Sequence, residues 1–201
     1  MKKLLFALLF LVGLTTNAQY TISGTFSPAK DYSWLIAYRL KPGTQVYVAD
    51  TSINDGVFTL RNPEKAESGT YRLVYAVPQE EFYFDLIYNG KEHIELTFES
   101  NKGAQFKTSQ ENILFSTYFR EVQELEGRLI AFYSNGSSDL EAFKKITQDY
   151  SAMQHSYVER STNLIVHEFI RANKPYIPPK HETIGEYVKN RKNTYFDVFG
   201  R

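Results

Sequence analysis

The spacing of apolar residues changes near Thr108 in this chain of 201 residues. Before Thr108 the apolar residues form short runs broken by Pro, Gly, Asn and Asp, which is the pattern of strands and turns. After Thr108 they recur every three or four residues, which is the period of an amphipathic helix. The sequence therefore predicts an α+β protein, in which an N-terminal antiparallel β-sandwich or barrel precedes an antiparallel helical hairpin or small helical bundle.

The N-terminal part contains a series of predicted strands joined by turn signals. Asn54-Asp55-Gly56 predicts a tight hairpin turn, because Asp and Gly tolerate the positive φ that such turns require. Asn89-Gly90-Lys91 is a second hairpin signal. The predicted strands are residues 20–26, 34–40, 44–53, 57–61, 69–77, 82–88 and 93–99.

Two long helices are predicted next, each preceded by a capping box at 108–111 or 138–141. The apolar stripe of the first helix consists of Leu114, Tyr118, Val122, Leu125, Leu129 and Phe132. The stripe of the second consists of Leu140, Phe143, Ile146, Tyr150, Met153 and Tyr157. Shorter helices are predicted over 163–172 and 184–189. The two stripes are expected to pack against each other.

The first stripe has a second interpretation as an interaction surface, formed by Tyr118, Val122, Leu125 and Leu129. A helix with such a stripe can also form a coiled coil with another copy of itself. A homodimer and a docking surface for another domain therefore remain open alternatives to a hairpin core.

The first eighteen residues have the layout of a secretory signal peptide. Lys2 and Lys3 are followed by an apolar run over 4–14, and cleavage is expected between Ala18 and Gln19. The run is too short to span a bilayer as a mature helix, so no membrane span is expected after cleavage. The predicted location is the periplasm or cell envelope, and Ala18-Gln19 offers no cysteine for a lipid anchor.

Composition excludes several functions. The chain has 23 basic and 23 acidic residues, so no global positive field is present to hold nucleic acid. It has no cysteine, which removes thiol nucleophiles, redox pairs and thiolate metal sites. The four histidines do not follow a metal-ligand spacing. We therefore expect no catalytic residue, no metal and no cofactor.

Two groups of residues retain weaker functional interpretations. Glu80, Glu81 and Asp85 lie among aromatic residues, as carboxylates do in glycosidases, but alternation along a strand separates them onto two faces. The strand tyrosines could line a groove for a small ligand such as a glycan, although core or cross-strand packing is the preferred interpretation. These tyrosines are Tyr38, Tyr47, Tyr71, Tyr75, Tyr83 and Tyr88.

Several segments together resemble one family. They are residues 20–24, 50–52, 55–58, 69–73, 84–86 and 94–96. On the basis of these segments, residues 19–108 resemble the β domain of the DUF4369 type. This domain is found at the N-terminus of envelope thioredoxin-like proteins of Bacteroidetes. Residues 109–201 resemble the helical segment that follows it. The end of the signal peptide, residues 16–19, is also similar to signal peptides of that phylum.

The resemblance implies a thioredoxin-like domain of the TlpA/ResA type, also described as alkyl hydroperoxide reductase and thiol-specific antioxidant, after the helices. Its Cys-x-x-Cys performs thiol-disulfide exchange, and no residue here matches it. The chain is therefore expected to be part of a longer protein, truncated at its C-terminal end. The predicted function is a non-catalytic envelope module that binds or positions a protein partner or a thioredoxin-like domain. A glycan-type ligand-binding protein is the alternative, and a hydrolase is a weaker third.

Overall fold

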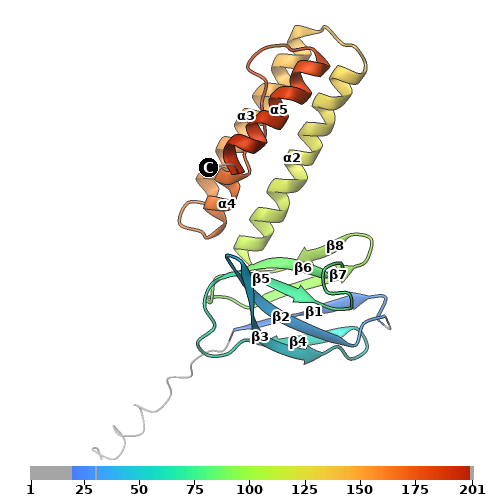
Figure 1. Cartoon of the computed structure of the whole chain (residues 1–201), viewed down its shortest axis with the longest axis vertical. Coiled ribbons are helices and arrows are strands. Elements are labelled where there is room, and N and C mark those ends of the chain that lie inside the picture. Colours follow the sequence, from blue (N-terminus) through green and yellow to red (C-terminus); the bar gives the residue numbers. More distant parts are fainter. Residues whose placement is uncertain (1–19, 30, 200–201) are drawn as a thin grey trace, which may run out of the picture. The chain divides into compact units, whose positions relative to one another are not determined.

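The structure is a computed structural model that describes residues 20–29 and 31–199, and side chains up to residue 193. The described residues form eight strands in two sheets, followed by four helices, which confirms the predicted α+β class. The chain divides into two compact units (Figure 1). The first, the sandwich unit, comprises the described residues up to Phe84 together with Gly90–Gln105. The second, the helical unit, comprises Asp85–Asn89 and the residues from Phe106 onward.

Each sheet has four strands. The first sheet has the order β4 (Val57–Arg61), β1 (Thr21–Ser27), β7 (Ile94–Glu99) and β8 (Gly103–Phe106). The second has the order β3 (Thr44–Ser52), β2 (Trp34–Lys41), β5 (Gly69–Val74) and β6 (Tyr83–Tyr88). Within the described residues the strands thus form two open sheets and no closed barrel. Of the two predicted architectures, the sandwich is the one observed.

One pair of strands departs from the antiparallel prediction. β1 and β7 run parallel, with Ile22 opposite Ile94 and Phe26 opposite Phe98. β1 pairs with β4, and β2 with β3 and β5, in the antiparallel sense. β7 returns to β1 after the rest of the sandwich has been built, and local turn signals do not specify such a distant pairing. The four-residue strand β8 was also not predicted.

Aromatic side chains from both sheets meet in the sandwich core. Phe98 of the first sheet lies with its ring centroid 4.7 Å from that of Tyr75 and 5.3 Å from that of Phe84, which both belong to the second-sheet side. Phe26 of β1 approaches Tyr75 at 5.6 Å. Rings in this range contact each other in offset or edge-to-face arrangements. The inward faces of the sheets therefore pack together as a sandwich does.

The helical unit is built around a hairpin of α2 (Gln110–Ser134) and α3 (Leu140–Arg160), followed by α4 (Val166–Ala172) and α5 (Ile184–Phe199) (Figure 1). The side chain of Ser109 caps α2 and that of Asp139 caps α3. α4 begins later than predicted, after Asn163 with its left-handed φ of 70°. α5 is longer than predicted.

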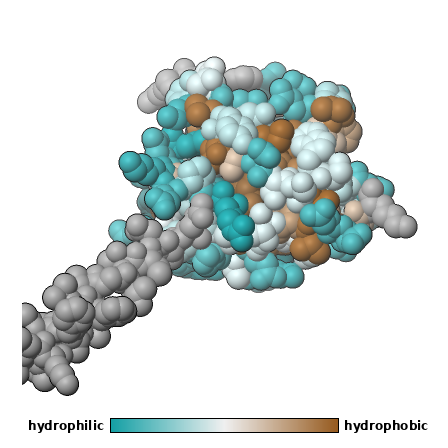
Figure 2. All heavy atoms as spheres, turned by 90° about the horizontal axis from the view of Figure 1, so that it is seen from below, coloured by the Kyte–Doolittle hydropathy of each residue, from teal (hydrophilic) through white to brown (hydrophobic). Residues whose placement is uncertain are grey.

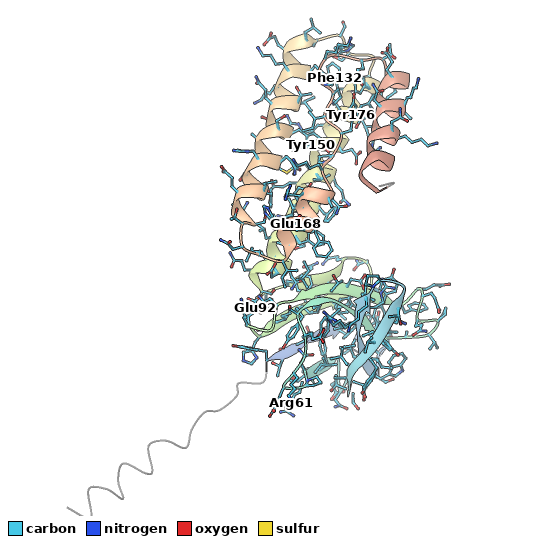
Figure 3. All side chains as sticks on the ribbon, turned by 60° about the vertical axis from the view of Figure 1, so that its left-hand side comes forward. Arg61, Glu92, Phe132, Tyr150, Glu168 and Tyr176 are labelled. Atoms are coloured by element: carbon cyan, nitrogen blue, oxygen red, sulfur yellow. The ribbon has the colours of Figure 1, made fainter. Side chains whose placement is uncertain are left out.

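The stripes of α2 and α3 supply the core of the helical unit, except Leu140, which was predicted in the second stripe but is 64% exposed (Figure 3). Tyr118, Tyr150 and Tyr157 are fully or almost fully buried. Glu111 is also buried, and its two carboxylate oxygens accept the backbone N–H groups of Ile165 and Val166 at 3.1 and 2.9 Å. A carboxylate is favourable at this position, because a helix N-terminus carries partial positive charge. This contact joins the start of α2 to the start of α4.

Candidate functional site

The outward faces of the two sheets differ in chemistry. In the central strands of the first sheet, inward apolar residues alternate with outward polar ones. The outward residues are Thr21, Ser23, Thr25 and Ser27 of β1 and Glu95, Thr97 and Glu99 of β7. A polar outward face is typical of an antiparallel-type sheet with one face in water.

The central strand β2 of the second sheet is apolar on both faces. Leu35 and Ala37 are fully buried and point inward, so the residues between them point outward. We call the outward side chains of this sheet the aromatic face. It includes the half-buried Trp34, Ile36, Tyr38 and Leu40 of β2, together with Tyr47 and Asp50 of β3, Arg72 of β5, and Tyr83 and Asp85 of β6.

A row of side chains crosses this face from strand to strand. Tyr38 is opposite Tyr47 on one side and opposite Arg72 on the other. The rings of Tyr38 and Tyr47 meet edge to face with centroids 6.4 Å apart. The Arg72 guanidinium carbon lies 3.7 Å from the ring centroid of Tyr83, which is cation–π geometry. The row therefore presents aromatic rings with one cation among them.

A β-bulge sets the position of Tyr47 at the edge of the row. Ala37 faces Ala49 and Tyr38 faces Tyr47, so Val48 is an extra residue in β3. The bulge brings Tyr47 and Asp50 to the same side of the strand, and the Tyr47 hydroxyl donates a hydrogen bond to the Asp50 carboxylate. This hydrogen bond raises the pKa of Tyr47 above its usual value. Tyr47 is 56% exposed despite this contact.

The six strand tyrosines named in the sequence separate into two groups. Tyr71 and Tyr88 are buried, and Tyr75 is half-buried among the core phenylalanines, where burial raises its pKa. Tyr38, Tyr47 and Tyr83 belong to the aromatic face instead. Only the second group is placed to meet a ligand from solvent.

The structure places the predicted helical interaction surface inside the helical unit. Tyr118 and Leu129 are fully buried, Leu125 is 8% exposed and Val122 is half-buried. This is the arrangement expected when the stripe forms the core of the hairpin. A role of the same stripe in binding another chain stays a prediction.

The described residues do not assemble a recognisable catalytic centre. Glu80 and Glu81 are exposed in the turn before β6. Ser161 and His167 approach within 2.9 Å, but Ser161 is fully buried, so its hydroxyl is not accessible to a substrate. Among the described residues, no group of three or more His, Asp or Glu is placed to hold a metal ion. The predicted cleavage site, Ala18-Gln19, lies outside the described residues.

The aromatic face is suited to binding rather than to chemistry. Tyrosine and tryptophan combine a large apolar area with a polar atom, and arginine pairs with carboxylates and stacks on rings. Both types are enriched where proteins bind one another. Reasoning from the sequence missed Trp34, Ile36, Leu40 and Arg72 as site residues. The signal was available, because an apolar run at both odd and even positions predicts a strand covered on both faces.

None of the described helices is long and apolar enough to cross a lipid bilayer. Comparison with protein-family models finds no match for this chain, and comparison with curated proteins likewise finds none.

Proposed function

We propose that this chain is an exported, non-catalytic binding module of the cell envelope whose aromatic face receives a protein partner. The partner we favour is a thioredoxin-like domain, either of another protein or of a longer form of this chain. The helical unit then acts as a spacer that carries the sandwich.

The observation that carries this proposal is the contrast between the two outward faces of the sandwich. The first sheet presents hydroxyls and carboxylates, whereas the second presents Trp34, Ile36, Tyr38 and Leu40 along one strand. Water in contact with such apolar area costs about 25 cal/mol per Å² relative to burial. A contiguous apolar surface rimmed by polar groups is typical of a protein-binding site.

Export is supported by the signal-peptide pattern of residues 1–18. Mass spectrometry of the protein isolated from the periplasm tests it. We expect a mature chain that begins at Gln19. A chain that still begins at Met1, or one that carries a lipid, would contradict the proposed processing.

Any thiol-disulfide exchange in the complex must be carried out by the partner. This chain has no cysteine, so it cannot form the mixed disulfide that thiol-disulfide exchange requires. We expect no insulin-reduction activity above background from the purified chain. The module would instead position a thioredoxin-like domain or its substrate.

Affinity capture from envelope extracts, followed by calorimetry with the purified partner, tests the binding face. Tyr38→Ala removes a ring from the centre of the aromatic face. Thr97→Ala is the matched control, because Thr97 is also half-buried and outward-facing on a central strand, but in the first sheet. We expect Tyr38→Ala to weaken partner binding at least tenfold and Thr97→Ala to leave it unchanged.

Equal binding by the wild type and Tyr38→Ala would remove the aromatic face as the binding surface. Stronger loss in Thr97→Ala would move the site to the first sheet. Capture of a partner without a thioredoxin-like domain would support a binding module but contradict the proposed thioredoxin-like partner.

A glycan-type ligand is the second candidate. It is favoured by the ring pair of Tyr38 and Tyr47 beside Arg72 stacked on Tyr83. Aromatic faces pack against the C–H surfaces of sugar rings, and a guanidinium donates to hydroxyls or carboxylates. Affinity electrophoresis in gels containing envelope polysaccharides separates the two candidates. Retardation of the wild type that Tyr38→Ala abolishes and Tyr38→Phe retains would support the glycan.

A further inference from the structure

The last helix, α5, is anchored to the helical unit by few of its side chains. Among the α5 side chains that the structure describes, only Tyr187 is buried, at 3% exposure. Ile184 and Val188 are 49% and 57% exposed. α3, by contrast, buries side chains along its length from Phe143 to Tyr157. Because a helix in a protein is stabilised mainly by the packing of its apolar face, α5 is the less stable of the two.

Exposed apolar side chains alone do not make an element easy to detach. The surface of the sandwich unit also shows apolar side chains among polar ones (Figure 2), and Val57 of β4 is 55% exposed. β4 is nevertheless held by backbone pairing with β1 over all five of its residues. The backbone hydrogen bonds of a helix lie within the helix itself, so α5 depends on side-chain contacts for its attachment.

The contact of α5 with α2 centres on one pair of rings. Tyr187 stacks on Tyr133 of α2 with the ring centroids 5.1 Å apart. Arg191 of α5 also forms an ion pair with Glu126 of α2, but the arginine side chain is 50% exposed, and exposed ion pairs stabilise a fold little. The buried cluster that Tyr187 joins consists of Leu129, Phe132, Tyr133, Phe143 and Ile146. One buried ring therefore supplies most of the attachment of α5.

Two buried polar groups at this contact lack hydrogen-bond partners. Glu182, 7% exposed, precedes α5, and its Oε1 accepts the Tyr176 hydroxyl at 2.7 Å and the Asn190 side-chain NH₂ at 2.8 Å. Its Oε2 has no partner among the described residues. The Tyr133 hydroxyl lies near the backbone of Glu182 but makes no well-aligned hydrogen bond within the described part of the chain. Each such unpaired atom disfavours the closed arrangement by a factor of about 5 to 140.

We propose that Glu182, Thr183 and α5 form a strap that opens from the hairpin while α2 and α3 stay folded. Opening withdraws one ring, Tyr187, from the core. It also lets water reach the Glu182 carboxylate and the Tyr133 hydroxyl, which are unpaired only in the closed form. An element held by few apolar contacts opens locally at a lower free energy than the rest of the fold.

The hinge of the strap lies between His181 and Glu182. The His181 ring contacts the rings of Phe132 and Phe143, with centroids 5.7 and 5.5 Å apart, and therefore stays with the hairpin. Pro178, three residues before it, is buried and lines a cavity together with residues of α3. The chain is thus held against the hairpin as far as His181, and the strap turns about the residues that follow.

The strap controls access to one end of the α2 stripe. Leu129, the last residue of the interaction surface predicted from the sequence, is fully buried in the same cluster as Tyr187. Opening removes Tyr187 from this cluster and lets solvent reach its remaining members. The strap belongs to the helical unit, so it operates whether or not the aromatic face of the sandwich unit binds a partner.

Hydrogen exchange of the full mature chain at pH 7, followed by mass spectrometry, tests the opening directly. We expect the amides of α5 to exchange at least 100 times faster than those in the middle of α2 and α3, around Leu125 and Tyr150. Equal exchange rates in the three helices would overturn the proposal, because α5 would then open only together with the whole helical unit.

Two variants that each remove one phenol hydroxyl should change this exchange in opposite directions. Tyr133→Phe removes the unpaired hydroxyl of the closed form, so we expect α5 to exchange about five times more slowly. Tyr176→Phe removes a donor to Glu182, so we expect α5 to exchange at least five times faster. Tyr47→Phe, in the sandwich unit, is the control and should leave α5 unchanged. A shift in the same direction for the first two variants, or no shift in either, would contradict the strap.

The absence of native cysteine allows a second test of the access that opening gives. Leu129→Cys places the only thiol in the cluster of Tyr187, and Leu114→Cys places it in the other buried cluster of the helical unit. We expect Tyr187→Ala, combined with each, to speed iodoacetamide labelling at least tenfold at position 129 and less than twofold at position 114. Equal acceleration at both positions would mean that Tyr187 supports the whole helical unit and would overturn the strap. Circular dichroism of each variant checks that the fold is retained.

Discussion

The sandwich unit and the helical unit fill their cores with different side chains. The sandwich buries mainly hydrocarbon, in residues such as Ile22, Leu35, Leu60, Leu73 and Leu96, with Tyr71 directing its hydroxyl to the carbonyl of Glu67 at 2.7 Å. The core of the helical unit is rich in tyrosine. Its buried tyrosines on the helices are Tyr118, Tyr133, Tyr150, Tyr157 and Tyr187.

A tyrosine core stabilises a fold only while its hydroxyls are protonated and have partners. The Tyr118 hydroxyl lies 2.7 Å from the carbonyl of Asn173, to which it donates, and Tyr157 donates to the Glu121 carboxylate at 2.8 Å. Burial raises the pKa of Tyr118, Tyr157 and Tyr187 to about 12 each. Burial also raises the pKa of Tyr150. The helical unit therefore depends on pH in a range where a hydrocarbon core does not.

The largest expected effect is alkaline unfolding of the helical unit before the sandwich. A pKa raised in the folded state gives stability that is complete below the unfolded value of about 10 and is lost as pH rises toward 12. Helical circular dichroism at 222 nm reports on the helical unit. The single tryptophan, Trp34, lies in the sandwich, and its fluorescence reports on that unit. We expect the helical signal to fall at lower pH than the tryptophan signal.

Coincident loss of both signals would mean that the two units unfold as one. Loss of the tryptophan signal first would reverse the comparison. Tyrosinate absorbance at 295 nm supplies the control, because loss of the helical signal should coincide with ionisation of the buried tyrosines.

The local sequence predicted the elements, and it could not predict which distant residues meet. The turn at Asn54-Asp55-Gly56 is encoded within a few residues, so its pattern was sufficient. The predicted capping boxes were wrong by one residue at each long helix, because Ser109 and Asp139 cap α2 and α3 in place of Thr108 and Ser138. The parallel pairing of Ile22 with Ile94 depends on the whole sandwich and leaves no local signal. The division of the strand tyrosines likewise depends on register. The face on which Tyr47 lies depends on a one-residue bulge that no local sequence pattern predicts.

The next largest effect concerns the core of the hairpin. Leu125 is 8% exposed in the middle of the α2 stripe, so Leu125→Ala should cost about 2–5 kcal/mol of unfolding free energy. Glu124→Ala, one residue away and exposed, should cost under about 0.5 kcal/mol. Thermal melts of both variants at two protein concentrations measure this. A loss for Leu125→Ala that depends on concentration would show that the stripe joins two chains.

A smaller effect is expected at Asn112 of α2, whose side chain pairs with Ile87 of β6 within the helical unit. Asn112→Asp keeps the shape of the side chain but replaces the group that donates to the Ile87 carbonyl with an oxygen. Two acceptors then face each other in a buried place, which should cost about 1–3 kcal/mol. Gln123→Glu makes the same amide-to-acid change on the exposed face of α2 and should be nearly neutral. Urea unfolding of both variants measures the difference. Equal urea midpoints would mean that the hydrogen bonds between Asn112 and Ile87 contribute nothing to stability.

The smallest effect tests whether the helical unit also depends on contacts at its surface. Asp139 accepts the N–H groups of Glu141 and Ala142, both at 3.0 Å, and so caps α3. Asp139→Ala should cost about 1 kcal/mol, whereas Asp139→Asn keeps the acceptor and should cost only a few tenths. Urea unfolding measures both. Because this cap is exposed and independent of the tyrosines, its cost should be the same at pH 7 and pH 9. A cost that grows with pH would mean that the cap and the tyrosine core share one cooperative network.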